Sequence, residues 1–402
     1  VSGKRTARSL NAAGLALPYR DAAEVLQFQP FDEDWGEVTS HAGSIIPPRG
    51  VFAGRTFHFS PPTRFGTAYR HDLEAARNIE VVLHANALQL ETNDAGTAVE
   101  RVRVAALSGR RITVEARHFV LAAGGVENPR LLLASNAVQH AGLGNASDCV
   151  GRYFMEHPEV VPARLVVTTP GVLESIQMLQ HGWALLALSE ESQRSEEVLN
   201  AGIQFLGGRP ETSEAGGVPL DIGHVVAQLD RAARDGEEGP AEPPVFMAAF
   251  VRCEAAPRPE NRVTLEEGQT DTLGMRRPRV QFKMGTLESR TIVRTLELLA
   301  REMGRRQGGR LRLTSPEAAL DVPLGEPPWQ DIRGGSHHMG TTRMSDDPAH
   351  GVVDRHCRVH GIENLFVAGS SVFPSCGMAN PTFTIVALAL RLAEHLASQM
   401  GA

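Results

Sequence analysis

Two histidines and an asparagine in the last part of the chain are the side chains best suited to chemistry. His337 and His338 lie side by side in the stretch HHMGTTRM, and Asn380 precedes a proline at the start of the apolar run NPTFTIVALALRLAEHL. A histidine can act as a general base because its ordinary pKa lies near the working pH. The Asn-Pro pair is typical of a helix start, with Asn380 as the N-cap and Pro381 as the first helical residue.

A helix start of this kind favours negative charge, because its backbone N–H groups are free and the helix dipole is positive there. A reduced flavin carries such a charge on its pyrimidine ring. The stretch NPTFTI, together with AGSS at residues 368–371, therefore suits a flavin, and a nearby histidine could serve as the base. Taken singly, a histidine in this loop also fits a surface position, and the Asn-Pro pair also fits an ordinary helix cap. The hypothesis of a flavin site therefore rests on the two features together.

Other catalytic motifs are missing from the sequence. It contains no GxGxxG, no Walker loop, no HExxH and no GxSxG. Adjacent histidines point apart in most backbones, and no carboxylate or cysteine at helical spacing joins His337 and His338, so the sequence predicts no metal site. The four cysteines lie far apart without a CxxC motif, which argues against a zinc ribbon or a disulfide framework and favours a reduced, intracellular protein.

Composition indicates a globular protein of more than one core. A length of 402 residues favours two domains or one elaborated domain, and the hydrophobic content of 42% is that of a folded protein. A net charge of −7 gives no reason to expect nucleic acid as a partner. No apolar run is long enough for a membrane span and no leader is visible, so we expect a cytoplasmic location. Because the chain begins with Val1, we also expect it to start inside a longer polypeptide.

The pattern of apolar residues divides the chain into segments with different expected structure. Residues 1–62 show weak periodicity and are expected to form an irregular linker or lid. Residues 63–150 predict a helix at 65–78, strands at 79–92 and 98–107, and a buried strand HFVLAAGG that leads into a helix at VENPRLLLAS. Small residues at that turn let the backbone approach a ligand closely, although a plain tight turn fits equally well.

The middle and last segments differ in texture. Residues 151–334 alternate strand-like stretches with polar loops, contain an amphipathic helix at 287–308, and are expected to form an inserted α+β domain on an antiparallel sheet. The acidic, Pro- and Gly-rich stretch 229–244 is expected to be a mobile loop. Residues 335–402 return to α/β character and should share one sheet with residues 63–150.

The quoted motifs closely resemble one known family. The stretch HHMGTTRM, followed by GVVD and RVHGIENLFVAGSSVFPSCGMANPTFTIVALALRLAEHL, resembles the C-terminal signature of the glucose–methanol–choline (GMC) oxidoreductases. It looks most like their bacterial sugar and polyol dehydrogenases and pyranose oxidase. FVLAAGGVENPRLLLAS and GLGNASDCVGRYFMEHP look like the same family, so the resemblance covers the chain from Thr63 to its end and is weakest between residues 160 and 330.

This resemblance implies an α/β fold, with an FAD-binding Rossmann-like domain that is incomplete in this chain and the inserted substrate domain. It implies that His337 is the catalytic base and that Asn380 orients the alcohol and stabilises the developing alkoxide. It further implies that FAD is contacted by residues at strand ends and at the last helix start: Ala87, Ala123, Gly124, Ala368, Gly369, Pro381 and Thr382.

One departure from the family pattern is large. The family's GxGxxG turn and the acidic residue that holds the ribose have no match in this sequence. The resemblance therefore implies that a missing N-terminal segment or a second chain completes the FAD site.

The implied activity is FAD-dependent oxidation of an alcohol, namely a sugar, glycoside or polyol. His337 would take the hydroxyl proton while hydride passes to the flavin, and oxygen, a quinone or another carrier would accept the electrons. Two alternatives stay open. The chain could be a non-catalytic subunit that completes a flavin site in a heteromer, or it could have another activity of the family, such as sterol or simple alcohol oxidase or hydroxynitrile lyase.

Overall fold

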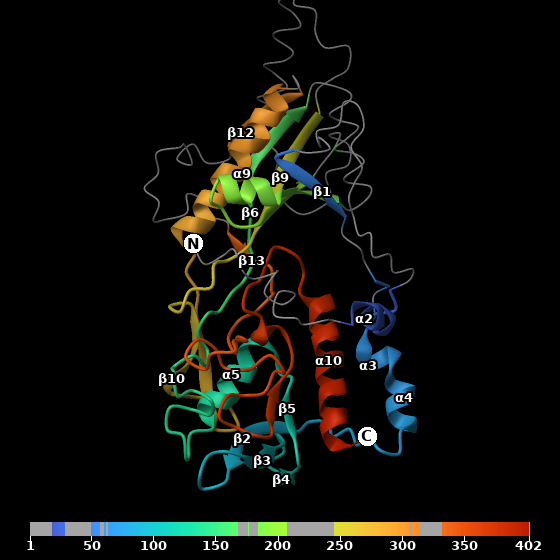
Figure 1. The fold of residues 1–402 in the computed structure, drawn as a ribbon, viewed down its shortest axis with the longest axis vertical. Helices are drawn as coiled ribbons and strands as arrows, with labels where there is room; N and C mark the ends of the chain where they lie inside the picture. Colours follow the sequence, from blue (N-terminus) through green and yellow to red (C-terminus); the bar gives the residue numbers. More distant parts are fainter. Residues whose placement is uncertain are drawn as a thin grey trace, which may run out of the picture.

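The computed structural model of the chain shows two lobes, one above the other in Figure 1. The structure describes residues 18–28, 50–56, 60–61, 63–167, 176, 184–206, 245–305, 308–313 and 332–401. The expected mobile loop at 229–244 lies outside these residues. Within the described parts, no helix is both long and apolar enough to cross a membrane, and no group of histidine, cysteine or acidic side chains is arranged to hold a metal ion.

A seven-stranded antiparallel sheet forms one lobe, which we call the substrate lobe after the domain expected from the sequence (Figure 1). The strand order is β1-β7-β8-β9-β6-β12, and β13 adds to β6 off this path. The strands are β1 (Phe52–Thr56), β6 (Pro158–Val167), β7 (Ala184–Leu188), β8 (Ala201–Leu206), β9 (Val245–Cys253), β12 (Gly309–Leu313) and β13 (Arg333–Gly334).

Helix α9 (Thr286–Arg305) packs its apolar face on this sheet. Ile292, Leu296, Leu299 and Met303 recur at intervals of three and four residues, so they lie on one face of the helix. All four are buried in the same cluster as the inward side chains of β6, β8 and β9. Burial of such side chains contributes roughly 1.5–3 kcal/mol each, and it anchors the helix predicted at 287–308.

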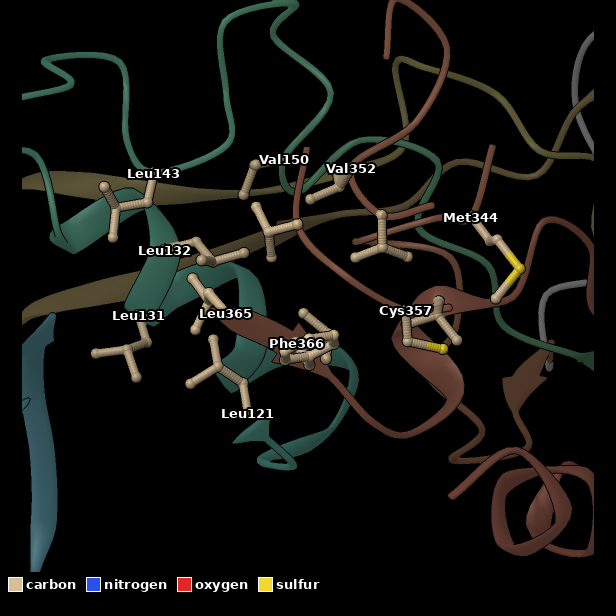
Figure 2. Packing of buried hydrophobic residues seen from close by; sticks show 14 of the residues in the cluster. Leu121, Leu131, Leu132, Leu143, Val150, Met344, Val352, Cys357, Leu365 and Phe366 are labelled. Atoms are coloured by element: carbon tan, nitrogen blue, oxygen red, sulfur yellow. The ribbon is translucent and has the colours of Figure 1, made fainter. Parts of the chain in front are cut away.

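The other lobe, which we call the flavin lobe after the FAD-binding domain expected from the sequence, is built around a parallel pair of strands. β5 (Phe119–Leu121) pairs with β14 (Leu365–Val367), with Phe119 opposite Leu365 and Leu121 opposite Val367. Parallel strands need a crossover, and here all strands of the substrate lobe except β1 lie within that connection. Figure 2 shows the buried cluster around this pair, including Phe366 and the side chains of α5 (Gly124–Ala134).

The remaining elements complete the flavin lobe and its flanks. β2, β3 and β4 form an antiparallel sheet, and the β10–β11 hairpin packs on α5. α2 packs on α10, the ring of Tyr19 stacking on Phe383 at a centroid distance of 5.2 Å. These elements are α2 (Tyr19–Val25), α3 (Phe65–Ala68), α4 (Arg70–Ala75), β2 (Asn86–Thr92), β3 (Val99–Ala105), β4 (Arg111–Glu115), β10 (Arg262–Thr270), β11 (Arg276–Gln281), η4 (Ser370–Val372) and α10 (Thr382–Met400). The short helix α7 (Glu190–Ser195) belongs to the substrate lobe, where it connects β7 and β8.

The structure differs from the expected elements in three places. The helix predicted at 65–78 is two short helices, α3 and α4, separated at Tyr69. α2 and β1 are regular elements inside residues 1–62, where we expected irregular structure. Their apolar patterns are too short to be recognised in the sequence. In the structure, α2 is stabilised by contact with α10, and β1 by pairing with β7. The proposed domain boundaries themselves remain a prediction.

The third difference concerns the strand predicted over residues 79–92, of which only Asn86–Thr92 is a strand. The preceding apolar residues Ile79, Val81, Val82 and Leu83 are exposed, Leu83 to 73%. Val120, the central residue of β5, is also exposed, to 44%. Apolar residues with a strand pattern and no cover indicate a surface that another segment could pair with or pack on.

Candidate active site around His337

Two chain segments from the two ends of the inserted region run side by side at the centre of the site. Met155 and Met339 form a β-bridge, each backbone N–H donating to the other's carbonyl at 2.9 and 3.0 Å. Close approach continues at Gly335, where an added Cβ would lie 3.0 Å from His337 Nδ1 and 2.9 Å from Glu159 Oε1. The absence of a side chain at Gly335 thus leaves room for the ring of His337.

Glu156 fixes the positions of the histidines that follow in both segments. Its Oε1 accepts hydrogen bonds from the backbone N–H of His157 at 3.0 Å and of His337 at 2.8 Å. Its Oε2 lies 3.3 Å from His338 Nε2. A buried carboxylate needs such partners, so the loop that carries His337 is anchored by a side chain from the other segment.

His337 lies against a second histidine. Its Nδ1 is 3.0 Å from His157 Nδ1, and the two rings meet edge to face. Burial, and then the positive charge of Arg252, lowers the pKa of His337, while Glu156 and Glu159 oppose the shift. His337 is therefore neutral at neutral pH and able to accept a proton.

His157 is the functional residue that our sequence interpretation missed. It is completely buried, and burial, followed by the effects of His337 and Arg252, lowers its pKa to about 3. The sequence contained it within GRYFMEHP, a motif quoted for the family resemblance. Nothing in the sequence showed that it meets His337, which lies 180 residues away.

Asn380 is held from the substrate lobe. Arg252, the penultimate residue of β9, donates from Nη1 to Asn380 Oδ1 at 2.7 Å and from Nε to Glu159 Oε1 at 2.7 Å. The ion pair Arg252–Glu159 is largely buried, each side chain being 16% exposed. His337 and Asn380 are thus both neighbours of Arg252, one through its charge and the other through a hydrogen bond.

The start of α10 differs by one residue from the sequence expectation. We expected Asn380 as the N-cap and Pro381 as the first helical residue, but Pro381 is the N-cap, Thr382 begins the helix, and no side chain caps it. The physical reason is that Arg252 binds the side-chain oxygen that would otherwise accept from the helix. The amide of Asn380 is therefore not used for capping.

His338 has a different environment from its neighbour. Its side chain is 45% exposed and its ring lies 5.4 Å from the ring of Phe154. Its carbonyl accepts from Ser370 Oγ at 2.7 Å, which ties this loop to the turn after β14. The adjacent histidines thus diverge, as expected from the sequence.

Four of the residues expected to contact FAD gather at the carboxyl ends of the parallel strands. Ala123 and Gly124 follow β5, and Ala368 and Gly369 follow β14. Asn128 connects the two turns, since its Oδ1 accepts from Ala123 N at 2.8 Å and its Nδ2 donates to Ala368 O at 3.2 Å. Such an edge of an α/β sheet is where nucleotides bind.

The backbone there fits a flavin nucleotide. Gly124 and Gly369 have φ of 87° and 109°, and an added Cβ at either glycine meets nothing within 4 Å. No side chain caps the start of α5, and the free N–H groups of a helix start suit a phosphate. Pro381 and Thr382 lie at the start of α10, beside Asn380, whereas Ala87 lies on the separate sheet of β2, β3 and β4.

Comparison with known proteins confirms the resemblance seen in the sequence. Residues 257–389 match the model of the C-terminal domain of the family described as GMC oxidoreductase. The chain is 29% identical over 301 residues to the fructose dehydrogenase large subunit of Gluconobacter japonicus, which covers 71% of this chain and 48% of that protein. It is also 29% identical over 313 residues to a C-glycoside 3-oxidase of Microbacterium trichothecenolyticum, covering 77% of this chain and 51% of the relative.

The fold comparison agrees. The crystal structure of pyridoxine 4-oxidase from Mesorbium loti superposes with a TM-score of 0.55 at 18% identity, covering 95% of this chain and 70% of the other. The predicted fold class, an α/β domain with an α+β insertion on an antiparallel sheet, is confirmed. The chain spans about half the length of the two relatives it matches in sequence.

Proposed function

We propose that this chain functions in an FAD-dependent oxidoreductase that oxidises the CH–OH group of a sugar, glycoside or polyol. The observation that carries the proposal is the neutral ring of His337, held at Nδ1 by His157 and flanked by Asn380 through Arg252. The named activities of the relatives, a fructose dehydrogenase and a C-glycoside 3-oxidase, support the substrate class.

The residues of the chain supply proton transfer and orientation. His337 accepts the hydroxyl proton of the alcohol at the nitrogen that His157 does not engage, and general-base catalysis of this kind contributes about 10²–10⁴ in rate. The NH₂ group of Asn380 donates to the substrate oxygen and stabilises negative charge on it. Arg252 holds Asn380 in this orientation because it occupies the amide oxygen.

The cofactor would be held by Ala123, Gly124, Ala368 and Gly369 on its nucleotide side and by Pro381 and Thr382 near its ring. Bound there, FAD would supply the acceptor for the hydride that leaves the carbinol carbon. Oxygen, a quinone or another carrier would reoxidise it, and the name of the fructose dehydrogenase large subunit supports a multi-subunit arrangement as one option. The chain would comprise a linker or lid segment at 1–62, a flavin-binding part at 63–150 and 335–402, and a substrate-binding part at 151–334.

A second candidate function is favoured by the uncovered apolar residues of the flavin lobe. Ile79, Val81, Val82 and Leu83 and the centre of β5 at Val120 are exposed, and no GxGxxG turn is present in the sequence. The chain would then contribute the catalytic half of a flavin site whose nucleotide-binding turn comes from a separate segment, either on the same polypeptide or on a partner chain.

The cofactor content and bleaching of the purified protein test both candidates. We expect a yellow protein whose flavin absorbance is lost anaerobically on addition of a reducing sugar or polyol. A colourless chain that becomes yellow and active only with a co-expressed partner supports the half-site function. A flavin-bound protein that no sugar, polyol or simple alcohol reduces contradicts the proposed oxidation.

A further inference from the structure

The contact between His157 and His337 joins the same nitrogen of two rings. A neutral imidazole has one N–H and one lone pair, so in a bond between two Nδ1 atoms one ring donates and the other accepts. Both rings are neutral near neutral pH, because burial lowers the pKa of each and brings that of His157 to about 3. The contact therefore also decides, for each ring, whether the remaining nitrogen Nε2 carries a proton.

The surroundings of His157 decide which ring donates. Its Nε2 is buried and makes no hydrogen bond of good geometry within the described structure. The backbone of Cys376 and Gly377, however, lies beside the ring and raises its pKa, as carbonyl oxygens do when they face an N–H. A proton on Nε2 is favoured there, whereas a buried lone pair would meet oxygen lone pairs. Because Nδ1 of His157 already faces His337, these surroundings favour a proton on Nε2 and an accepting Nδ1.

We propose that His157 is a positioning residue that fixes the tautomer of His337, so that Nδ1 of His337 is protonated and its Nε2 keeps the lone pair. The chemical use of that lone pair rests on the proposed function, but the tautomer is a property of the chain itself. When Nε2 takes the substrate's hydroxyl proton, the proton on Nδ1 stays in its bond to His157. The ring then needs no reorientation during proton transfer.

The charged and titratable groups around the pair explain why a neutral acceptor is used. Oε1 of Glu156 accepts from two backbone N–H groups, and its Oε2 faces His338. Glu159 is paired with Arg252. A carboxylate bonded to Nδ1 of His337 would fix the same tautomer but would also raise the pKa of the ring. His157 fixes the tautomer without adding negative charge.

Nitrogen-15 NMR of histidine-labelled protein reads the tautomer directly, with or without flavin, and His337→Gln assigns the signals. We expect a protonated Nδ1 and an unprotonated Nε2 for His337 in the parent. His157→Asn, whose amide oxygen can replace Nδ1 as acceptor, should keep this tautomer. His157→Gln, whose amide reaches the position of Nε2 instead, should lose it. A parent His337 protonated at Nε2, or an unchanged tautomer in His157→Gln, overturns the proposal.

Kinetics of the flavin-loaded protein give the second readout. His157→Gln should slow flavin reduction by about 10²-fold, within the range for general-base catalysis, with little change in KM, and His157→Asn should recover most of the rate. His118→Gln, which alters another histidine with a buried nitrogen in the flavin lobe, should match the parent. Equal rates for the Asn and Gln variants contradict the proposal. If no alcohol reduces the parent, the proposed function fails while the NMR result still stands.

Discussion

The substitution Asn380→Asp distinguishes the two groups of the Asn380 amide, namely the oxygen that binds Arg252 and the NH₂ group proposed to bind the substrate. The structure assigns Oδ1 of Asn380 to Arg252, at 2.7 Å, and aspartate keeps an oxygen at that position. The NH₂ group, which aspartate lacks, is the part available to a substrate oxygen. The variant therefore removes the proposed donor and preserves the contact that orients the side chain.

The magnitude follows from what is lost. Removing one preorganised donor to a developing oxyanion costs about 2.7–4 kcal/mol of transition-state stabilisation, or about 10²–10³ in rate. The fold should tolerate the change, because Asn380 is exposed and an ion pair with Arg252 at such a site contributes about 0–1 kcal/mol. If Asn380 served only as a helix cap, aspartate would replace it without loss of rate.

Anaerobic stopped-flow reduction of the bound flavin measures the chemical step, and thermal unfolding measures the fold. Asn364→Asp is the matched control, because the amide of Asn364 donates to the carbonyls of Val99 and Arg117 in the same lobe and has a structural role. We expect that control to unfold at lower temperature and to reduce its flavin at the parental rate. Near-parental reduction in Asn380→Asp would refute the assignment of Asn380 to the active site.

Three further predictions test other parts of the site. His337→Ala should slow flavin reduction at least about 10²-fold and leave flavin bound, whereas His338→Ala should change mainly affinity or packing; comparable losses of rate would show that the wrong histidine was chosen. Gly340→Ala should destabilise the fold, because its φ is 86° and the new Cβ would lie 2.3 Å from the carbonyl oxygen of Tyr153; an unchanged unfolding temperature would contradict this. His157 has a pKa of about 3 when folded and 6.5 as its ordinary value, so the unfolded state binds its proton first and stability should fall as pH falls through that window, by up to about 1.4 kcal/mol per pH unit. His157→Asn should remove that part of the slope, as measured by chemical denaturation at several pH values.

Long elements with a regular apolar pattern could be predicted from the sequence. The period of α9 and the apolar runs that become β5, β9 and β14 are local properties of the chain, so they could be read directly. The strand predicted from residue 79 was wrong over residues 79–85, because an apolar pattern forms a strand only when a partner supplies hydrogen bonds. α2 and β1 were missed for the opposite reason, since distant partners stabilise patterns too short to recognise.

In the candidate site, too, local features could be predicted from the sequence and contacts between distant segments could not. His337 and Asn380 could be selected because their residue types and their motif are local features. His157 and Arg252 could not, because their roles come from contacts across 180 and 128 residues. The tautomer of a base depends on the lone pairs around it, and these are set only when the lobes fold together. The signal that could have found His157 was its place in GRYFMEHP, a motif already assigned to the family.

If another segment covers the exposed apolar residues at 79–83 and Val120, the stability of the flavin lobe depends on the concentration of that segment. A segment that binds this surface and not the unfolded chain stabilises the fold by about 2.7 kcal/mol when its concentration is a hundredfold above its dissociation constant. A separate partner chain would therefore raise the melting temperature in proportion to the logarithm of its concentration. A segment on the same polypeptide would give a melting temperature independent of dilution. The melting behaviour of the lobe thus distinguishes completion in cis from completion in trans.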